Sequence, residues 1–104
     1  MKINLAQAKT IVNKKLESLE NKIGGKLVLI ENATIEKEYY WVFFYNSKIY
    51  LETGNISYAL AGNSPIFFDK VFGEMYEPGT AYPIEFYIED FEKTKLPILI
   101  KAKC

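Results

Sequence analysis

Residues 39–46 restrict the fold more than any other stretch, because almost every one of them is aromatic or β-branched. Such residues favour strands, and the lack of polar alternation predicts a strand that is covered on both faces. Trp41 is expected to be a core ring in this strand, with ligand stacking as the alternative. The chain has 104 residues, 49% of them hydrophobic. That is enough apolar material for one domain spanning 1–104.

An amphipathic helix is predicted over residues 5–23, where apolar side chains recur at three- and four-residue steps. Asn4 and Gln7 have the spacing of an N-terminal capping box. Gly24 and Gly25 follow, and glycine readily takes the left-handed conformation that ends helices. We expect the helix to pack on a sheet through one face, formed by Leu5, Ala8, Val12, Leu16, Leu19 and Ile23.

Strands are predicted on both sides of a long loop at 47–64. A strand at 26–31 and a polar stretch at 32–38 precede the aromatic run. After the loop, residues 65–68 and 73–76 predict a β-hairpin. The sheet therefore has its candidate strands in the middle of the chain.

Five residues around this hairpin are candidates for structural roles. Gly62 and Asn63 permit a tight turn, so we expect a structural corner there. Pro65 at the start of a strand removes no important ladder bond. Asp69 and Gly73 lie in the hairpin connection, where glycine tolerates a positive φ.

The C-terminal part predicts a second, short helix over 83–92, with Pro83 and Glu85 suited to its first turn. The apolar tail at 96–100 predicts one more strand, at a sheet edge because Pro97 has no N–H for a ladder. No βαβ alternation occurs, so the sheet should be antiparallel. We expect an α+β fold whose N-terminal helix packs on an antiparallel sheet of about four strands, with a short C-terminal helix.

Charge is segregated along the chain although it sums to zero, with 13 lysines against 13 acidic residues. Residues 1–26 carry a net charge of +4, and residues 69–92 carry −6. The ordinary interpretation is solvated faces, and the alternative is an acidic surface that steers a basic partner. Arginine is absent from the sequence. Sequence-specific DNA-binding proteins commonly contact guanine through arginine side chains, so we expect no nucleic-acid partner.

Residues that carry catalysis or bind metals are scarce. The chain has no histidine and one cysteine, Cys104, which excludes thiolate zinc sites, Cys–His nucleophile pairs and an internal disulfide. Glu89, Asp90 and Glu92 cluster, but neighbouring helix positions do not converge on one point. A carboxylate-only Mg²⁺ site assembled across the fold stays open. We expect no enzyme and no cofactor.

Targeting signals are also lacking. The N-terminus leads directly into the charged amphipathic run, and no segment reaches ~18 consecutive apolar residues. We therefore expect a cytoplasmic protein without a membrane partner.

Several short motifs occur together between residues 5 and 92. In chain order they are Trp41-Val-Phe-Phe-Tyr45, Leu60-Ala-Gly-Asn-Ser-Pro-Ile66, Asp69-Lys70 with Gly73, Thr80-Ala-Tyr-Pro83 and Tyr87-Ile88. Behind the leading helix, this combination resembles the immunity protein 35 family, also called YrhB-like domains. The resemblance implies a small α+β protein that is encoded beside a polymorphic toxin and neutralises it by binding. It transfers no catalytic residue. Val71 and Phe72 replace an expected polar pair, and the lysine-rich tail lies outside the resemblance.

Two hypotheses about function follow. The first is an immunity protein that occludes a cognate toxin encoded by a neighbouring gene. The alternative is a stand-alone chaperone-like or protein-stabilising binding module, and a homodimer stays open. Partner contact is expected on the loop at 47–64 and on the neighbouring acidic surface, or else Tyr50, Leu51 and Tyr58 only seal the sheet end. The candidate partner-binding residues are Tyr50, Glu52, Tyr58, Glu74, Tyr76 and Glu77.

Overall fold

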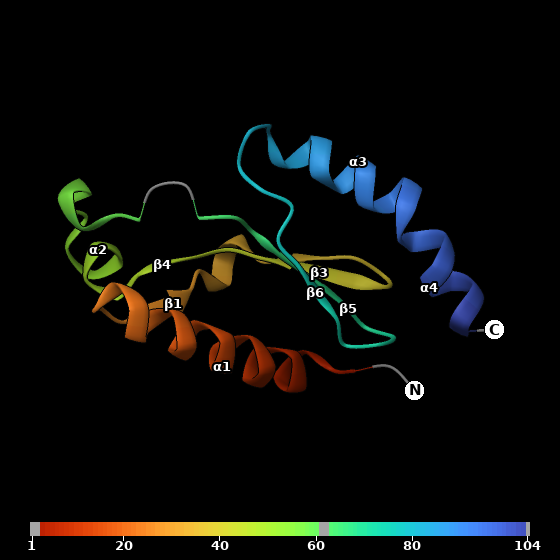
Figure 1. Ribbon diagram of the computed structural model, residues 1–104, viewed down its shortest axis with the longest axis horizontal. Coiled ribbons are helices and arrows are strands. Elements are labelled where there is room, and N and C mark those ends of the chain that lie inside the picture. The colour runs from red at the N-terminus through yellow and green to blue at the C-terminus, as the bar shows by residue number, and fades with distance from the viewer. Residues whose placement is uncertain (1–2, 61–62, 104) are drawn as a thin grey trace.

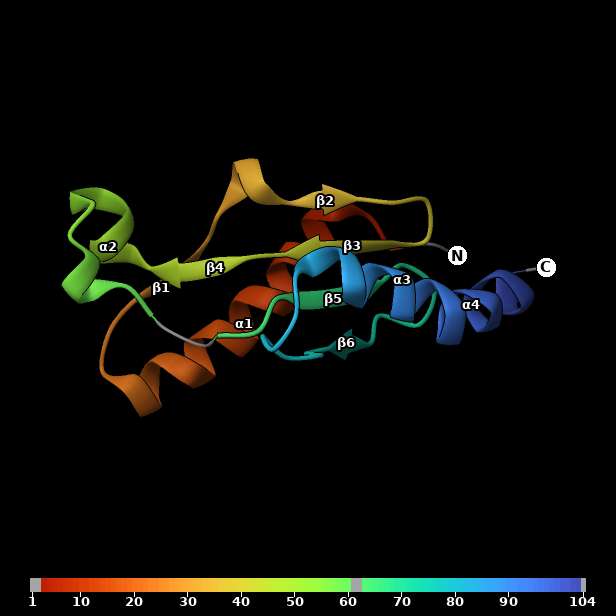
Figure 2. The ribbon, with the colours of Figure 1, turned by 90° about the horizontal axis from the view of Figure 1, so that it is seen from above.

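Different helices cover the two faces of the central sheet. In the computed structural model, which describes residues 3–60 and 63–103, α1 (Leu5–Ile23) packs on one face. The other face is covered by α3 (Ile84–Thr94) and α4 (Leu96–Lys103), as Figures 1 and 2 show. The predicted α+β fold is therefore confirmed.

The main sheet has four strands in the order β2–β3–β5–β6, and all of its pairings are antiparallel. A separate ladder joins β1 to β4. With η marking a 3-10 helix, the remaining elements are β1 (Leu27–Leu29), η1 (Glu31–Ala33), β2 (Ile35–Glu36), β3 (Tyr40–Phe43), β4 (Tyr45–Ser47), α2 (Lys48–Thr53), η2 (Ile56–Tyr58), β5 (Ile66–Asp69) and β6 (Met75–Tyr76).

The aromatic run at 39–46 forms two strands, because β4 leaves the main sheet after Phe44 and pairs with β1. Successive side chains of a strand point to opposite faces. Trp41 and Phe43 accordingly pack in the cluster under α1, whereas Tyr40 and Val42 pack in the cluster under α3 and α4. All four side chains are buried. The prediction of a strand covered on both faces is confirmed, and the prediction of one continuous strand was wrong.

Helix α1 has the predicted bounds and caps. Asn4 and Gln7 form the reciprocal capping box, and Gly24 ends the helix with φ 77°. Ala8, Val12 and Leu16 are buried against the sheet, and Leu19 packs at its margin. Leu5 and Ile23, at the two ends of the predicted face, are exposed. A helix of 19 residues is about 28 Å long, which exceeds the span of the four-residue strand β3 below it.

The predicted hairpin connects β5 to β6, with Phe68 opposite Met75. Its turn is organised by the buried carboxylate of Asp69, which accepts backbone N–H bonds from Val71, Phe72, Gly73 and Glu74. Gly73 has φ 73°, and a Cβ there would lie 2.7 Å from Cδ1 of Ile3. Both the conformation and the close approach therefore require glycine.

The tail at 96–100 is not a strand, because it belongs to helix α4. Pro97 lies in the first turn of α4, where the missing N–H would have no helical partner. Leu99 inserts into the cluster formed with Tyr40 and Phe67. Helix α3 also differs from its prediction, since it extends to Thr94 and Pro83 is its N-cap.

Two segments that were expected to lack regular structure contain short elements. The loop at 47–64 holds α2 and η2, and the polar stretch at 32–38 includes β2. Ser47 caps α2 by accepting a hydrogen bond from Tyr50 N at 3.2 Å. Asn55 caps η2 in the same way through Ser57 N at 3.0 Å. These caps satisfy backbone N–H groups in the first turn of each helix and so stabilise α2 and η2 within the predicted loop.

Candidate functional site

The predicted partner-binding residues fall into two separate groups. Tyr50, Glu52 and Tyr58 lie on α2 and η2, whereas Glu74, Tyr76 and Glu77 lie on and beside β6. Figures 1 and 2 place α2 at one end of the molecule and β6 beneath α3, away from that end. The structure therefore does not bring the six residues into one patch.

The first group belongs to an exposed apolar surface on residues 48–58, which we call the α2–η2 surface. Neither α2 nor η2 has a buried residue. Tyr50 is half-buried and Glu52 is exposed, with its carboxylate 4.0 Å from Nζ of Lys48. Ile56 is the most exposed large apolar side chain described, at 80%. The large apolar side chains that this surface exposes are Ile49, Leu51, Ile56 and Tyr58.

The second group is partly occupied by contacts within the chain. The Tyr76 hydroxyl donates to the Glu74 carboxylate at 3.2 Å. Glu77 pairs with Lys15 at 2.8 Å and so ties the end of β6 to α1. Burial raises the pKa of Tyr76 to about 12, with further contributions from Asp69 and Glu74. The Tyr76 hydroxyl therefore stays protonated, and able to donate to Glu74, to a higher pH than an ordinary tyrosine.

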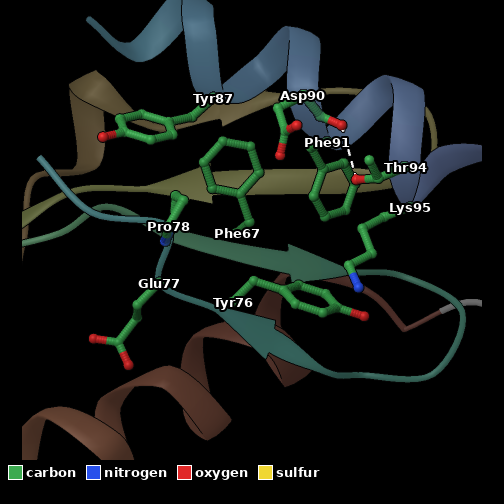
Figure 3. Close-up of a pocket in the computed structure, with 9 residues that line it drawn as sticks. All are labelled: Phe67, Tyr76, Glu77, Pro78, Tyr87, Asp90, Phe91, Thr94 and Lys95. Atoms are coloured by element: carbon green, nitrogen blue, oxygen red, sulfur yellow. Dashed lines mark hydrogen bonds between the residues drawn. The ribbon is translucent and has the colours of Figure 1, made fainter. Parts of the chain in front are cut away.

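A pocket of about 300 Å³ lies between α3 and the strands β5 and β6 (Figure 3). Phe67, Tyr76 and Phe91 contribute aromatic walls, and the ring centroids of Phe67 and Tyr76 lie 5.2 and 5.6 Å from that of Phe91. The complete lining is Phe67, Tyr76, Glu77, Pro78, Tyr87, Asp90, Phe91, Thr94 and Lys95. Tyr76 and Glu77 are the predicted partner-binding residues in this lining. The sequence prediction missed the remaining ones, because they line one pocket only after α3 packs across the β5–β6 hairpin.

The wall behind this pocket is fixed by Tyr40. Its ring centroid is 4.4 Å from that of Phe91, and its hydroxyl donates to the Glu92 carboxylate at 2.7 Å. Burial, together with the neighbouring Glu92 carboxylate, raises the pKa of Tyr40 well above its ordinary value. The rings under α3 are thus held in place by a hydrogen bond as well as by packing.

The residues predicted to be structural lie in or beside the core. Trp41 is 2% exposed and packs in the cluster under α1. Asn63 donates from Nδ2 to the carbonyl oxygen of Tyr45 at 2.7 Å, and Pro65 directly precedes β5. Asp69 and Gly73 shape the hairpin turn described above. Gly62 lies outside the described residues, as does Cys104.

The described residues contain neither a candidate metal site nor a candidate membrane-spanning helix. Within residues 3–60 and 63–103, no group of three or more His, Cys, Asp or Glu side chains is placed to hold a metal ion. Across the same residues, no helix is both long and apolar enough to cross a membrane.

Comparison with known proteins points to one family. The sequence profile of a family described as immunity protein 35 matches residues 6–92. A protein of Escherichia coli strain K12, named uncharacterized protein YrhB, is 44% identical over 55 residues. That match covers 53% of this chain and 58% of the E. coli protein. No solved structure matches the chain.

Proposed function

Because the chain belongs to the immunity protein 35 family, we propose that it binds a cognate bacterial toxin in the cytoplasm and neutralises it by stoichiometric occlusion, without catalysis. We infer binding by occlusion from the α2–η2 surface, because this short segment exposes four large apolar side chains. Large apolar side chains that are exposed close together along the chain are a feature of interaction sites.

The caps of α2 and η2 support this assignment. Side chains of Ser47 and Asn55 hold the two helices, and Gly54 between them takes φ 71°. The apolar side chains are therefore presented on an ordered backbone before any partner arrives. Preordered segments lose less conformational entropy on binding, so more of the contact energy appears as affinity.

Titration of the toxin against the wild-type protein tests the proposal. Protection should saturate near one-to-one, because nothing in an occlusion mechanism turns over. Ile56→Ala and Tyr58→Ala should each weaken the affinity by about tenfold, as expected for central apolar contacts. Thermal unfolding of each variant checks that it is folded.

A matched control is available on α4, at the opposite end of the molecule (Figure 1). Ile98 is also an exposed apolar residue, at 56%, and Ile98→Ala should leave toxin affinity unchanged. Protection at strongly substoichiometric ratios would contradict occlusion, since it requires turnover. Equal protection of an unrelated aggregation-prone protein would instead favour the chaperone-like alternative.

A further inference from the structure

The pocket under α3 has walls that attract cations. Its aromatic lining comes from Phe67 on β5, Tyr76 on β6, and Tyr87 and Phe91 on α3. The face of an aromatic ring carries negative charge density, and a cation within about 6 Å of the ring centroid is attracted to it. The Tyr76 ring already attracts a cation of this chain, because Nζ of Lys95 lies 5.3 Å from its centroid.

Asp90 adds a full negative charge to the pocket. Figure 3 shows its carboxylate directed from α3 toward the rings of Phe67 and Phe91. Among the described residues, Asp90 forms no salt bridge, since Lys93 on the same helix pairs with Glu89 at 2.9 Å. The Asp90 carboxylate is thus available to a cation that enters from outside.

Neutral and anionic occupants fit this site less well than a cation does. An apolar side chain would contact the rings but would leave the exposed Asp90 carboxylate without an opposite charge. An anion would be repelled by Asp90 and by the aromatic faces. Residues 69–92, with their net charge of −6, add a field that attracts basic partners from a distance.

Arginine matches the pocket better than lysine does. Its planar guanidinium stacks on aromatic faces and donates two parallel hydrogen bonds to a carboxylate. Tyr76 offers a half-buried ring and Asp90 an exposed carboxylate, whereas Phe67 and Phe91, 1% and 5% exposed, form the floor of the pocket. Lys95, on a flexible and exposed stem, is the cation that an incoming guanidinium would displace from Tyr76.

We propose that this pocket receives an arginine side chain of the protein partner, with Asp90 as its carboxylate, Tyr76 as its wall and Phe67 and Phe91 as its floor. The inference rests on the proposed function, because it names the chemistry of the residue that the partner inserts. It also assigns Lys95 an opposing role, since the Lys95 ammonium competes with the arginine for the same ring.

The pocket is tested first without the toxin. The probe is N-acetyl-arginine N-methylamide, titrated into isotope-labelled protein while the NMR signals of the lining rings are followed. We expect saturable shifts at Phe67, Tyr76 and Phe91, weakened severalfold in Asp90→Asn and strengthened in Lys95→Gln. The neutral norleucine analogue should produce none of them. Equal shifts with norleucine, or no shifts with arginine, would overturn the inference.

The control variant removes the same charge from the same helix. Glu85→Gln lowers the acidity of α3 by one charge, but Glu85 does not line the pocket, and the pair of Lys93 with Glu89 stays intact. Binding of the arginine probe should therefore survive Glu85→Gln and not Asp90→Asn. Equal loss in both variants would indicate long-range attraction alone and would overturn the assignment of Asp90.

The toxin separates this inference from the proposed function. Asp90→Asn should weaken toxin binding by about tenfold, the loss expected for one charge-assisted contact, while Lys95→Gln should not weaken it. If Asp90→Asn binds the toxin like wild type while Ile56→Ala binds weakly, the pocket inference fails and the proposed function stands. If the wild-type protein gives no one-to-one protection, the proposed function itself fails, whatever the arginine probe shows.

Discussion

At the scale of single residues, Trp41 contacts both the apolar core and a buried lysine. Its ring lies 6.1 Å from the rings of Phe43 and Phe68 in the cluster under α1. Nζ of Lys70 lies 4.5 Å from the ring centroid of Trp41 and 3.2 Å from the Glu36 carboxylate. The indole therefore supports a buried lysine as well as filling the core.

Removing this ring should be strongly destabilising. Trp41→Ala should lower the free energy of unfolding by roughly 3–5 kcal/mol, because neighbouring side chains cannot refill so large a cavity. Denaturant melts measure the loss. Phe86→Ala is the matched control, since Phe86 is 51% exposed and its truncation should change stability by less than about 1 kcal/mol. A loss below about 1 kcal/mol for Trp41→Ala would contradict its place in the core.

At the scale of elements, Leu99 is the buried residue among the described side chains of α4 and docks this helix on the sheet. Leu99 is 1% exposed, whereas its neighbours Ile98 and Ile100 are exposed. We expect Leu99→Ala to lower the free energy of unfolding by about 2–5 kcal/mol, because it leaves a cavity against Tyr40 and Phe67. Ile98→Ala should stay within about 0.5 kcal/mol of wild type. Equal losses in thermal or denaturant unfolding would show that α4 does not dock through Leu99.

The apolar run explains why the sequence predicted a strand there. Ile98, Leu99 and Ile100 are all apolar, and the period of so short a run does not distinguish a strand from a buried helix. Pro97 suits a sheet edge and the first turn of a helix equally well.

Helix α1 and the β5–β6 hairpin were predictable because their signals are local, such as the Asn4 cap and the glycine turn. The pocket was not, since its walls meet only through sheet register and the placement of α3.

At the scale of the whole molecule, the two proposed contact regions lie far apart. The molecule extends 46 Å along its longest axis, with α2 at one end and the pocket under α3 toward the other (Figures 1 and 2). Specific protein interfaces bury about 800 Å² on each partner, which is a broad patch. One toxin molecule would therefore have to reach along much of the longest axis to contact both regions.

This arrangement predicts how the two regions combine. Substitutions that are well separated and share no contacts have additive free-energy effects. The double variant Ile56→Ala/Asp90→Asn should therefore bind the toxin more weakly than either single variant, with the two fold-losses multiplying to within about twofold. Calorimetric titration of the wild-type, single and double variants gives the four dissociation constants. If the second substitution causes no further loss, the toxin does not use both regions in one complex.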